Sequence, residues 1–79
     1  MTDSEVLQKI EEIVRDELDD DSISLTMTTR ASDIDGWDSL AHVVIMVAVE
    51  RQFDVQFKSS EITTLKDIGN LVQLVQSAR

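Results

Sequence analysis

The amino-acid sequence predicts an all-α protein, built as an antiparallel bundle of three main helices with a long, ordered first loop. The 79 residues include no proline and only two glycines, so few residues interrupt a helix. Two segments, near the two ends, repeat apolar residues with the period of a helix, and a long apolar segment lies between them. One additional short turn of helix fits near residues 59–62.

The first helix is expected to begin at Thr2 and to end at the acidic run 19–21. Thr2 and Glu5 have the spacing of a capping box, in which each residue satisfies a backbone N–H of the other. Clustered carboxylates are unfavourable at the negative end of a helix, so the run 19–21 ends it. Apolar residues recur on one face of this segment, at Val6, Leu7, Ile10, Ile13, Val14 and Leu18.

Residues 19–38 show no helical period and form a long connector. A loop of this length inside a small domain is unusual unless it is packed or functional. Apolar residues are spaced along it that can anchor it to the bundle, namely Ile23, Leu25, Met27 and Ile34. We therefore expect an ordered loop, with a short turn near residues 28–32.

The second helix is expected to begin at residue 38 or 39 and to end near Phe53. Asp38 is a favourable N-cap, and Gly36 just before it lets the chain turn. Residues 40–49 are apolar except for His42, and their β-branched side chains would also suit a buried strand, but the length of the run after a cap favours a helix. The segment has more apolar surface than one core face can use, so we expect exposed or partner-bound side chains among Val43, Val44 and Val47.

Residues 54–62 read as a linker that Val55 and Phe57 anchor. The last helix is expected to begin at residue 63 or 64, because Thr64 and Asp67 repeat the capping spacing. Its apolar stripe consists of Leu65, Ile68, Leu71, Val72 and Val75. Without internal repeats or a low-complexity linker, residues 1–79 are interpreted as a single domain.

Composition argues against several classes of function. The chain has 16 acidic and 7 basic residues and a net charge of −9, which disfavours nucleic-acid binding. It has no cysteine and one histidine, His42, too few ligands for a Cys- or His-based metal centre. No apolar run is long enough for a membrane span and no secretory signal is visible, so the default location is the cytoplasm. We expect a non-catalytic acidic module that meets other proteins.

Two patterns in the sequence resemble a catalytic pair and a metal-binding loop, and both are disfavoured. Ser39 and His42 lie three residues apart on one helical face, as a nucleophile and its base could, but no third group orients the imidazole. A histidine that faces solvent or a partner is the favoured interpretation. Asp33, Asp35 and Gly36 resemble half of a calcium loop, but this alignment puts non-ligand residues at the first and last ligand positions. The acidic run 19–21 is interpreted as a solvated charge cluster.

One serine has a position that suits covalent modification. Ser39 lies in the first turn of the predicted second helix, directly after a long loop. The free N–H groups and the positive dipole end there would stabilise a phosphate ester on its oxygen. The alternative is that Ser39 only helps Asp38 to cap the helix, and spacing alone favours that alternative.

The string Asp38-Ser39-Leu40, entered from Gly36, resembles the acyl carrier protein family. The similarity continues through the apolar helix that ends in Glu50-Arg51-Gln52-Phe53, through Asp54-Val55, and through residues 62–68. It covers essentially the whole chain, including the acidic first helix and the long loop.

This resemblance implies a function and a cofactor. Members of the family carry 4′-phosphopantetheine on the serine that corresponds to Ser39, and the thiol of this arm holds acyl groups as thioesters. The absence of cysteine fits, because the reactive sulfur would arrive with the arm. Asp38 corresponds to the acid that a phosphopantetheinyl transferase and its magnesium approach. Further implied partners are acyl-transferring, condensing and modifying enzymes, and the bundle interior would shelter the acyl chain.

The sequence departs from fatty-acid carriers at several positions. Ala41 and Val44 stand where those proteins usually have acids that partners read, Trp37 is bulky, and residues 57–63 leave little room for the usual third helix. We interpret these differences as signs of a specialised carrier in a polyketide-like or secondary pathway. The expected partner-binding residues are Leu40, Ala41, Val43, Val44, Val47 and Glu50.

A second function remains open at this point. An acidic helical adaptor could dock on other proteins without carrying any covalent group. The two functions differ in whether the Ser39 oxygen is modified. Nothing in the sequence requires an oligomer, so a monomer is expected for both.

Overall fold

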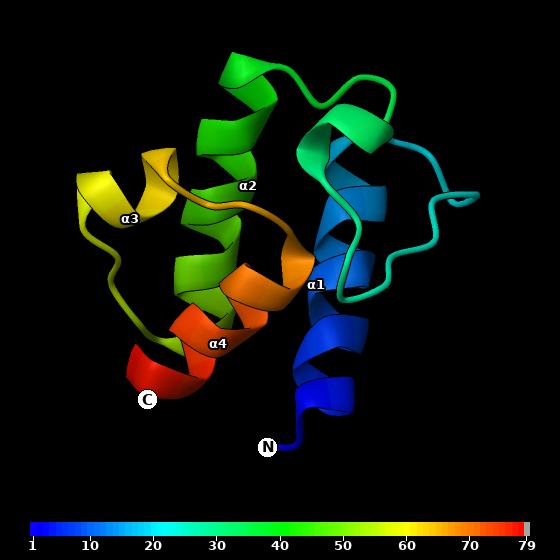
Figure 1. Ribbon diagram of the computed structural model, residues 1–79. Coiled ribbons are helices and arrows are strands. Elements are labelled where there is room, and N and C mark those ends of the chain that lie inside the picture. The colour runs from blue at the N-terminus through cyan, green and yellow to red at the C-terminus, as the bar shows by residue number, and fades with distance from the viewer. Residues whose placement is uncertain (79) are drawn as a thin grey trace.

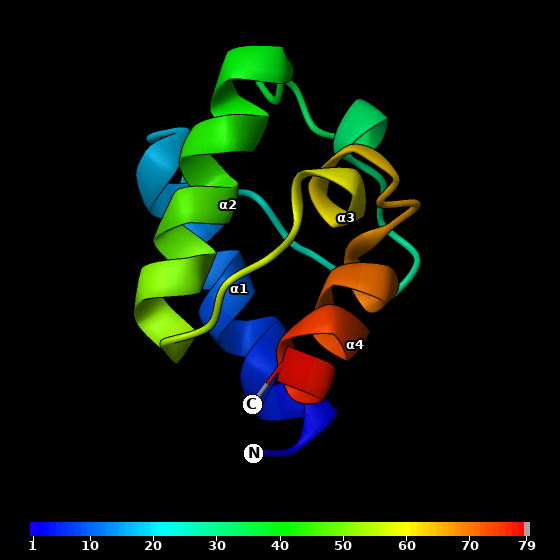
Figure 2. The same ribbon diagram turned by 90° about the vertical axis from the view of Figure 1, so that its left-hand side faces the viewer.

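The computed structural model describes residues 1–78, and in these residues every regular element is helical, as predicted. The helices are α1 (Asp3–Glu17), α2 (Ser39–Phe53), α3 (Ser59–Thr63) and α4 (Ile68–Ala78), and a 3-10 turn covers Ala31–Asp33. Figure 1 shows that α2 runs opposite to α1, while α4 crosses them obliquely. The start of α1 and the end of α4 lie at the same end of the molecule in Figure 1 and Figure 2, where Gln76 Nε2 donates a hydrogen bond to the Met1 carbonyl.

The capping box predicted for α1 is present. Glu5 N donates to Thr2 Oγ1 at 3.2 Å, and Thr2 N donates to Glu5 Oε1 at 2.9 Å. The backbone N–H of Thr2 lowers the pKa of the Glu5 carboxyl from its ordinary value of 4.5. The stabilisation from this pair is therefore complete above pH 4.5 and is lost as the pH falls through the lowered value.

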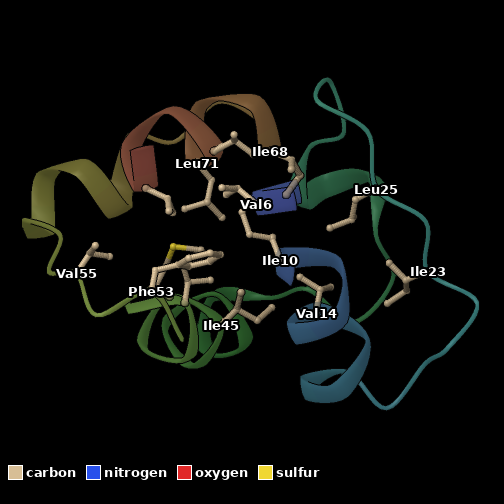
Figure 3. Close-up of a cluster of buried hydrophobic side chains, with 14 residues drawn as sticks. Val6, Ile10, Val14, Ile23, Leu25, Ile45, Phe53, Val55, Ile68 and Leu71 are labelled. Atoms are coloured by element: carbon tan, nitrogen blue, oxygen red, sulfur yellow. The ribbon is translucent and has the colours of Figure 1, made fainter. Parts of the chain in front are cut away.

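The apolar core lies between the three main helices, and α1 packs against both α2 and α4. Figure 3 shows side chains from these helices converging with residues from the connecting segments. Ile23, Leu25 and Val55 are buried although they lie outside any helix, so the connectors complete the core. The fully buried side chains are Val6, Ile10, Val14, Ile45, Met46, Val49, Leu71, Val72 and Val75.

The long first loop is ordered and packed, as predicted. Leu25 N donates to Glu11 Oε2 at 2.9 Å, and Arg15 Nε donates to the Ile23 carbonyl at 2.6 Å, so α1 holds the first half of the loop. The second half meets the start of α4, where Gly69 N donates to the Met27 carbonyl at 2.7 Å. The turn expected near residues 28–32 is the 3-10 turn at 31–33.

The predicted start of the last helix was wrong by about one turn. Thr64 is the C-cap of α3 and not the N-cap of α4. The cap of α4 is Asp67, whose Oδ1 accepts a hydrogen bond from Asn70 N at 2.8 Å. The additional turn of helix expected near residues 59–62 is present as α3, so residues 57–63 do leave room for a third helix. Residues 65–67 connect it to α4.

We expect added salt or magnesium to raise the melting temperature near neutral pH. The net charge is −9, and within residues 1–78 the Arg15–Glu11 pair on α1 is the one ion pair. Most carboxylates therefore repel one another without a close cation, and screening weakens that repulsion. Thermal melts followed by circular dichroism should shift by about 5 °C, which corresponds to about 1 kcal/mol in a domain of this size. A melting temperature that neither salt nor magnesium changes would contradict the view that repulsion between carboxylates destabilises the fold.

Candidate functional site

Ser39 is the first residue of α2 and its side chain is exposed. The cap of this helix is made by Asp38, whose Oδ1 accepts a hydrogen bond from Ala41 N at 2.8 Å. No hydrogen bond among residues 1–78 involves the Ser39 hydroxyl. A shared capping role therefore does not occupy this serine, and its oxygen is available for chemistry.

The turn before α2 presents Ser39 to solvent. Gly36 has φ +88°, a conformation that other residues adopt with strain. A Cβ at this position would meet no atom within 4 Å. Glycine is therefore favoured here by the backbone conformation and not by a lack of space. Trp37 N donates to the Ile34 carbonyl at 3.3 Å, which ties the turn to the end of the long loop.

The start of α2 offers a favourable environment for a phosphate ester. Ala41 N is taken by Asp38, but the N–H groups of Ser39 and Leu40 find no acceptor among residues 1–78. These donors and the positive end of the helix dipole stabilise an anion on the Ser39 oxygen. The site therefore fits a phosphate-linked prosthetic group by its own chemistry.

A surface groove of about 600 Å³ begins at Ser39. It runs between the start of α2 and the segment that contains α3, and most of its wall is apolar. Its lining residues are Ala31, Trp37, Asp38, Ser39, His42, Val43, Ile62, Thr63 and Leu65. An apolar group attached near Ser39 could lie in this groove and remain partly shielded from water.

His42 has a different role from the one that the sequence suggested. It was expected to face solvent or a partner, but its side chain is half-buried and both ring nitrogens are engaged. Nδ1 is 3.0 Å from Trp37 Nε1, and Nε2 is 3.0 Å from the Ile62 carbonyl. The correct interpretation is an internal histidine that links three segments, and neither nitrogen is placed to activate Ser39.

The predicted partner-binding residues divide into two groups. Four apolar side chains of α2 form an exposed stripe with helical spacing: Leu40 is 74 % exposed, Val43 56 %, Val44 42 % and Val47 40 %. Ala41 is half-buried and packs against the core. Glu50 is also half-buried, and its Oε2 accepts a hydrogen bond from Phe57 N at 2.8 Å, so it supports the loop after α2.

Residues 1–78 offer neither a cluster of metal ligands nor a membrane-spanning helix. No group of three or more histidine, aspartate or glutamate side chains is placed there to hold a metal ion. None of the helices in this range is long and apolar enough to cross a bilayer. The start of α2 and its groove are therefore the strongest candidate site in this part of the chain.

Similarity to known sequences shows the family of this chain. Residues 8–75 match the family described as "Phosphopantetheine attachment site". The acyl carrier protein of Petrotoga mobilis is 32% identical over 75 residues, which cover 95% of this chain and 88% of the relative. This chain belongs to the acyl carrier protein family. The acyl carrier protein of Phenylobacterium zucineum is similar to it at 30% identity over 73 residues, with 92% of each chain covered.

A solved structure agrees with this assignment to the acyl carrier proteins. The solution NMR structure of the holo acyl carrier protein of Geobacter metallireducens superposes with a TM-score of 0.85 and 41% sequence identity. The matched region covers 92% of this chain and 84% of that protein. The resemblance found in the sequence is thus confirmed, the protein is an acyl carrier protein, and its prosthetic group is 4′-phosphopantetheine.

The linked pair Trp37 and His42 was missed from the sequence. A signal was present, because the one tryptophan precedes the one histidine by five residues, and that histidine interrupts an apolar run. A polar group on a buried helix face needs a hydrogen-bond partner, and a nearby indole N–H is a suitable donor. The third member, the Ile62 carbonyl, has no signal in the sequence because it depends on where α3 lies.

Proposed function

We propose that Ser39 is the residue that carries 4′-phosphopantetheine, and that this carrier is a non-catalytic shuttle for acyl groups. The observation that carries the proposal is the exposed Ser39 hydroxyl at the start of α2, which has no capping role because Asp38 makes the cap. When bound, the prosthetic group supplies a thiol that holds acyl groups as thioesters.

The attachment step uses one atom of this chain as the nucleophile. Ser39 Oγ forms a bond to the β-phosphorus of coenzyme A, the bond from that phosphorus to 3′,5′-ADP breaks, and the hydroxyl proton passes to a base of the transferase. By the family resemblance, the exposed Asp38 carboxylate would face the transferase and would help to hold its magnesium. The unpaired N–H groups at the start of α2 then stabilise the phosphodiester.

Thiol titration tests the proposal with little background, because the chain has no cysteine. Purified protein would be incubated with coenzyme A, magnesium and a broad-specificity phosphopantetheinyl transferase, and the small molecules removed. We expect the thiol content to rise from zero to one per chain, with the matching increase in intact mass. An unchanged mass and no thiol would favour the alternative function, an acidic adaptor without covalent cargo.

The exposed stripe of α2, defined by Leu40, Val43, Val44 and Val47, is proposed as the surface that partner enzymes contact. It lies directly after Ser39 on the same helix, so a partner that receives the arm would meet it. Because the stripe is uncharged, partners with an apolar docking surface fit it better than partners with a basic one. This difference supports a specialised pathway. The partners that we propose are enzymes that transfer, condense or modify acyl groups in the cytoplasm.

Val44→Glu is expected to weaken binding to a native partner enzyme by about tenfold, since burying one valine side chain is worth roughly 1.5 kcal/mol or more. Affinities of the holo proteins would be measured at two salt concentrations. Gln52→Glu is the matched control, because Gln52 is exposed on the same helix and gains the same charge far from Ser39. A complex that ignores Val44→Glu, or that dissociates at modest salt, would contradict an apolar docking surface.

A further inference from the structure

Three segments meet through hydrogen bonds beside Ser39. Trp37, in the turn before α2, places its Nε1 3.0 Å from His42 Nδ1. His42, on α2, places its Nε2 3.0 Å from the carbonyl oxygen of Ile62 on α3. The indole and imidazole rings lie 6.0 Å apart between centroids and are tilted by 35°.

The chemistry of the three groups fixes the protonation of His42. An indole N–H can only donate, so Nδ1 of His42 must accept and carries no proton. A backbone carbonyl can only accept, so Nε2 must donate its proton to Ile62. The neutral imidazole with hydrogen on Nε2 satisfies both partners at once, which makes the arrangement a fully paired link.

Trp37 and His42 line two spaces of very different size. Both side chains line the groove of about 600 Å³ that begins at Ser39. They also line a small hollow of about 30 Å³, whose wall includes the buried side chains of Met46 and Leu71 and, at the surface, Lys66 and Asp67. With the side chains in these positions, the hollow has no room for an acyl chain.

The same link helps to hold α3 in place. This short helix contributes no fully buried side chain, and Ile62 packs partly buried against the core. Within the described residues, the His42–Ile62 hydrogen bond is the one that joins residues 58–64 to another part of the chain. A wider passage into the core would therefore require that α3 move and that this bond break.

We propose that Trp37 and His42 form a closed gate between the groove at Ser39 and the apolar interior, so that this carrier holds short acyl groups at its surface. The proposal rests on attachment of the arm at Ser39. A short acyl group lies against Val43, Ile62 and Leu65 in the groove without disturbing the gate. A longer chain can enter the core only by displacing the indole and breaking both hydrogen bonds.

The gate predicts that the thioester is equally exposed for short and medium chains. The apo protein would be loaded from butyryl- and octanoyl-coenzyme A by a phosphopantetheinyl transferase, and thioester cleavage by hydroxylamine would be followed by intact mass. In the acyl-loaded protein without amino-acid substitutions, we expect closely similar cleavage rates for the two acyl groups. In His42→Ala and Trp37→Ala, the octanoyl thioester should be cleaved at least about fourfold more slowly than the butyryl thioester, the effect of burying one further methylene group.

Two control variants distinguish loss of the gate from a general effect of substitution. His42→Gln keeps one acceptor and one donor on the side chain, so it should behave as the protein without substitutions does. Gln52→Ala changes an exposed residue of α2 outside the groove, and it should also leave the two rates similar. Fourfold protection of octanoyl in Gln52→Ala or His42→Gln would contradict the assignment of the gate to Trp37 and His42.

Three results would overturn the proposal. The first is octanoyl protection in the unmodified sequence, and the second is unchanged rates in folded His42→Ala and Trp37→Ala. If either variant does not fold, Trp37 fluorescence in the unmodified protein decides, because it is the one tryptophan. Its emission maximum should be the same with butyryl and octanoyl cargo. A clear shift of this emission maximum with octanoyl is the third result that would overturn the proposal. A protein that gains no acyl-arm mass would instead contradict attachment at Ser39.

Discussion

Ser39→Ala is expected to abolish modification while leaving the fold intact. The variant removes the proposed nucleophile, so incubation with coenzyme A and a phosphopantetheinyl transferase should leave the thiol content at zero. Stability should hardly change, because Asp38 continues to accept the hydrogen bond from Ala41 N that caps α2. Thiol titration, intact mass and a thermal melt measure these three outcomes.

Ser59→Ala is the matched control for this prediction. Ser59 is also an exposed serine at the first position of a helix, but it starts α3 and has no glycine turn before it. We expect this variant to gain one thiol per chain, as the unmodified sequence does. Modification of Ser39→Ala, or its loss in Ser59→Ala, would place the attachment site elsewhere.

Gly69→Ala is expected to destabilise the protein by roughly 1–3 kcal/mol, the typical cost of overpacking. A Cβ on Gly69 would lie 2.6 Å from the Met27 carbonyl oxygen, which is backbone and cannot swing away. The same carbonyl accepts the hydrogen bond from Gly69 N at 2.7 Å, so relief of the clash would break the junction between the long loop and α4. Urea unfolding of the two proteins measures the difference.

The expected change in the free energy of unfolding has the opposite sign to the usual effect of this substitution in a helix. Replacing glycine by alanine in a helix without a clash stabilises it by up to about 1 kcal/mol. Ser77→Ala, at an exposed position of α4, is the control and should change the free energy of unfolding by less than about 0.5 kcal/mol. Stabilisation by Gly69→Ala would show that the loop and α4 are not in close contact at Met27.

Local signals were sufficient to predict α1 and α2. The capping box at Thr2 and the cap at Asp38 are interactions between residues three apart, and both were found where the sequence placed them. The stripe of Val6, Ile10 and Val14 is fully buried, because an apolar stripe on a long helix can be read from its period alone. The anchors Ile23 and Leu25 were also identified from their spacing in the loop.

The start of α4 could not be predicted in the same way. Two capping signals compete there, at Thr64 and at Asp67, and the contacts between distant segments determine which one is used. Ile68 N donates to the Thr29 carbonyl at 2.8 Å, so the loop before α2 accepts the first N–H of α4. Local propensity contains no information about this contact.

The candidate site was predicted in part. Ser39, Asp38 and the exposed valines follow from one helix and its cap, and a single segment of sequence contains them all. The groove could not be predicted from a single segment of sequence, because its walls come from α2, the preceding loop and the segment around α3. The hydrogen bond that Glu50 accepts from Phe57 N was not predicted either, because it depends on how the chain folds back after α2.

The central claim is that the Ser39 oxygen carries the arm, and tandem mass spectrometry of peptides from the modified protein tests it most directly. Digestion with a protease that cleaves before aspartate would separate the segment around Ser39 from those that contain the other exposed serines, including Ser32 and Ser59. We predict that the whole added mass of phosphopantetheine lies on the peptide with Ser39, and that fragment ions place it on that residue. An added mass on any other residue, or a Ser39 peptide that remains entirely unmodified, would contradict the account.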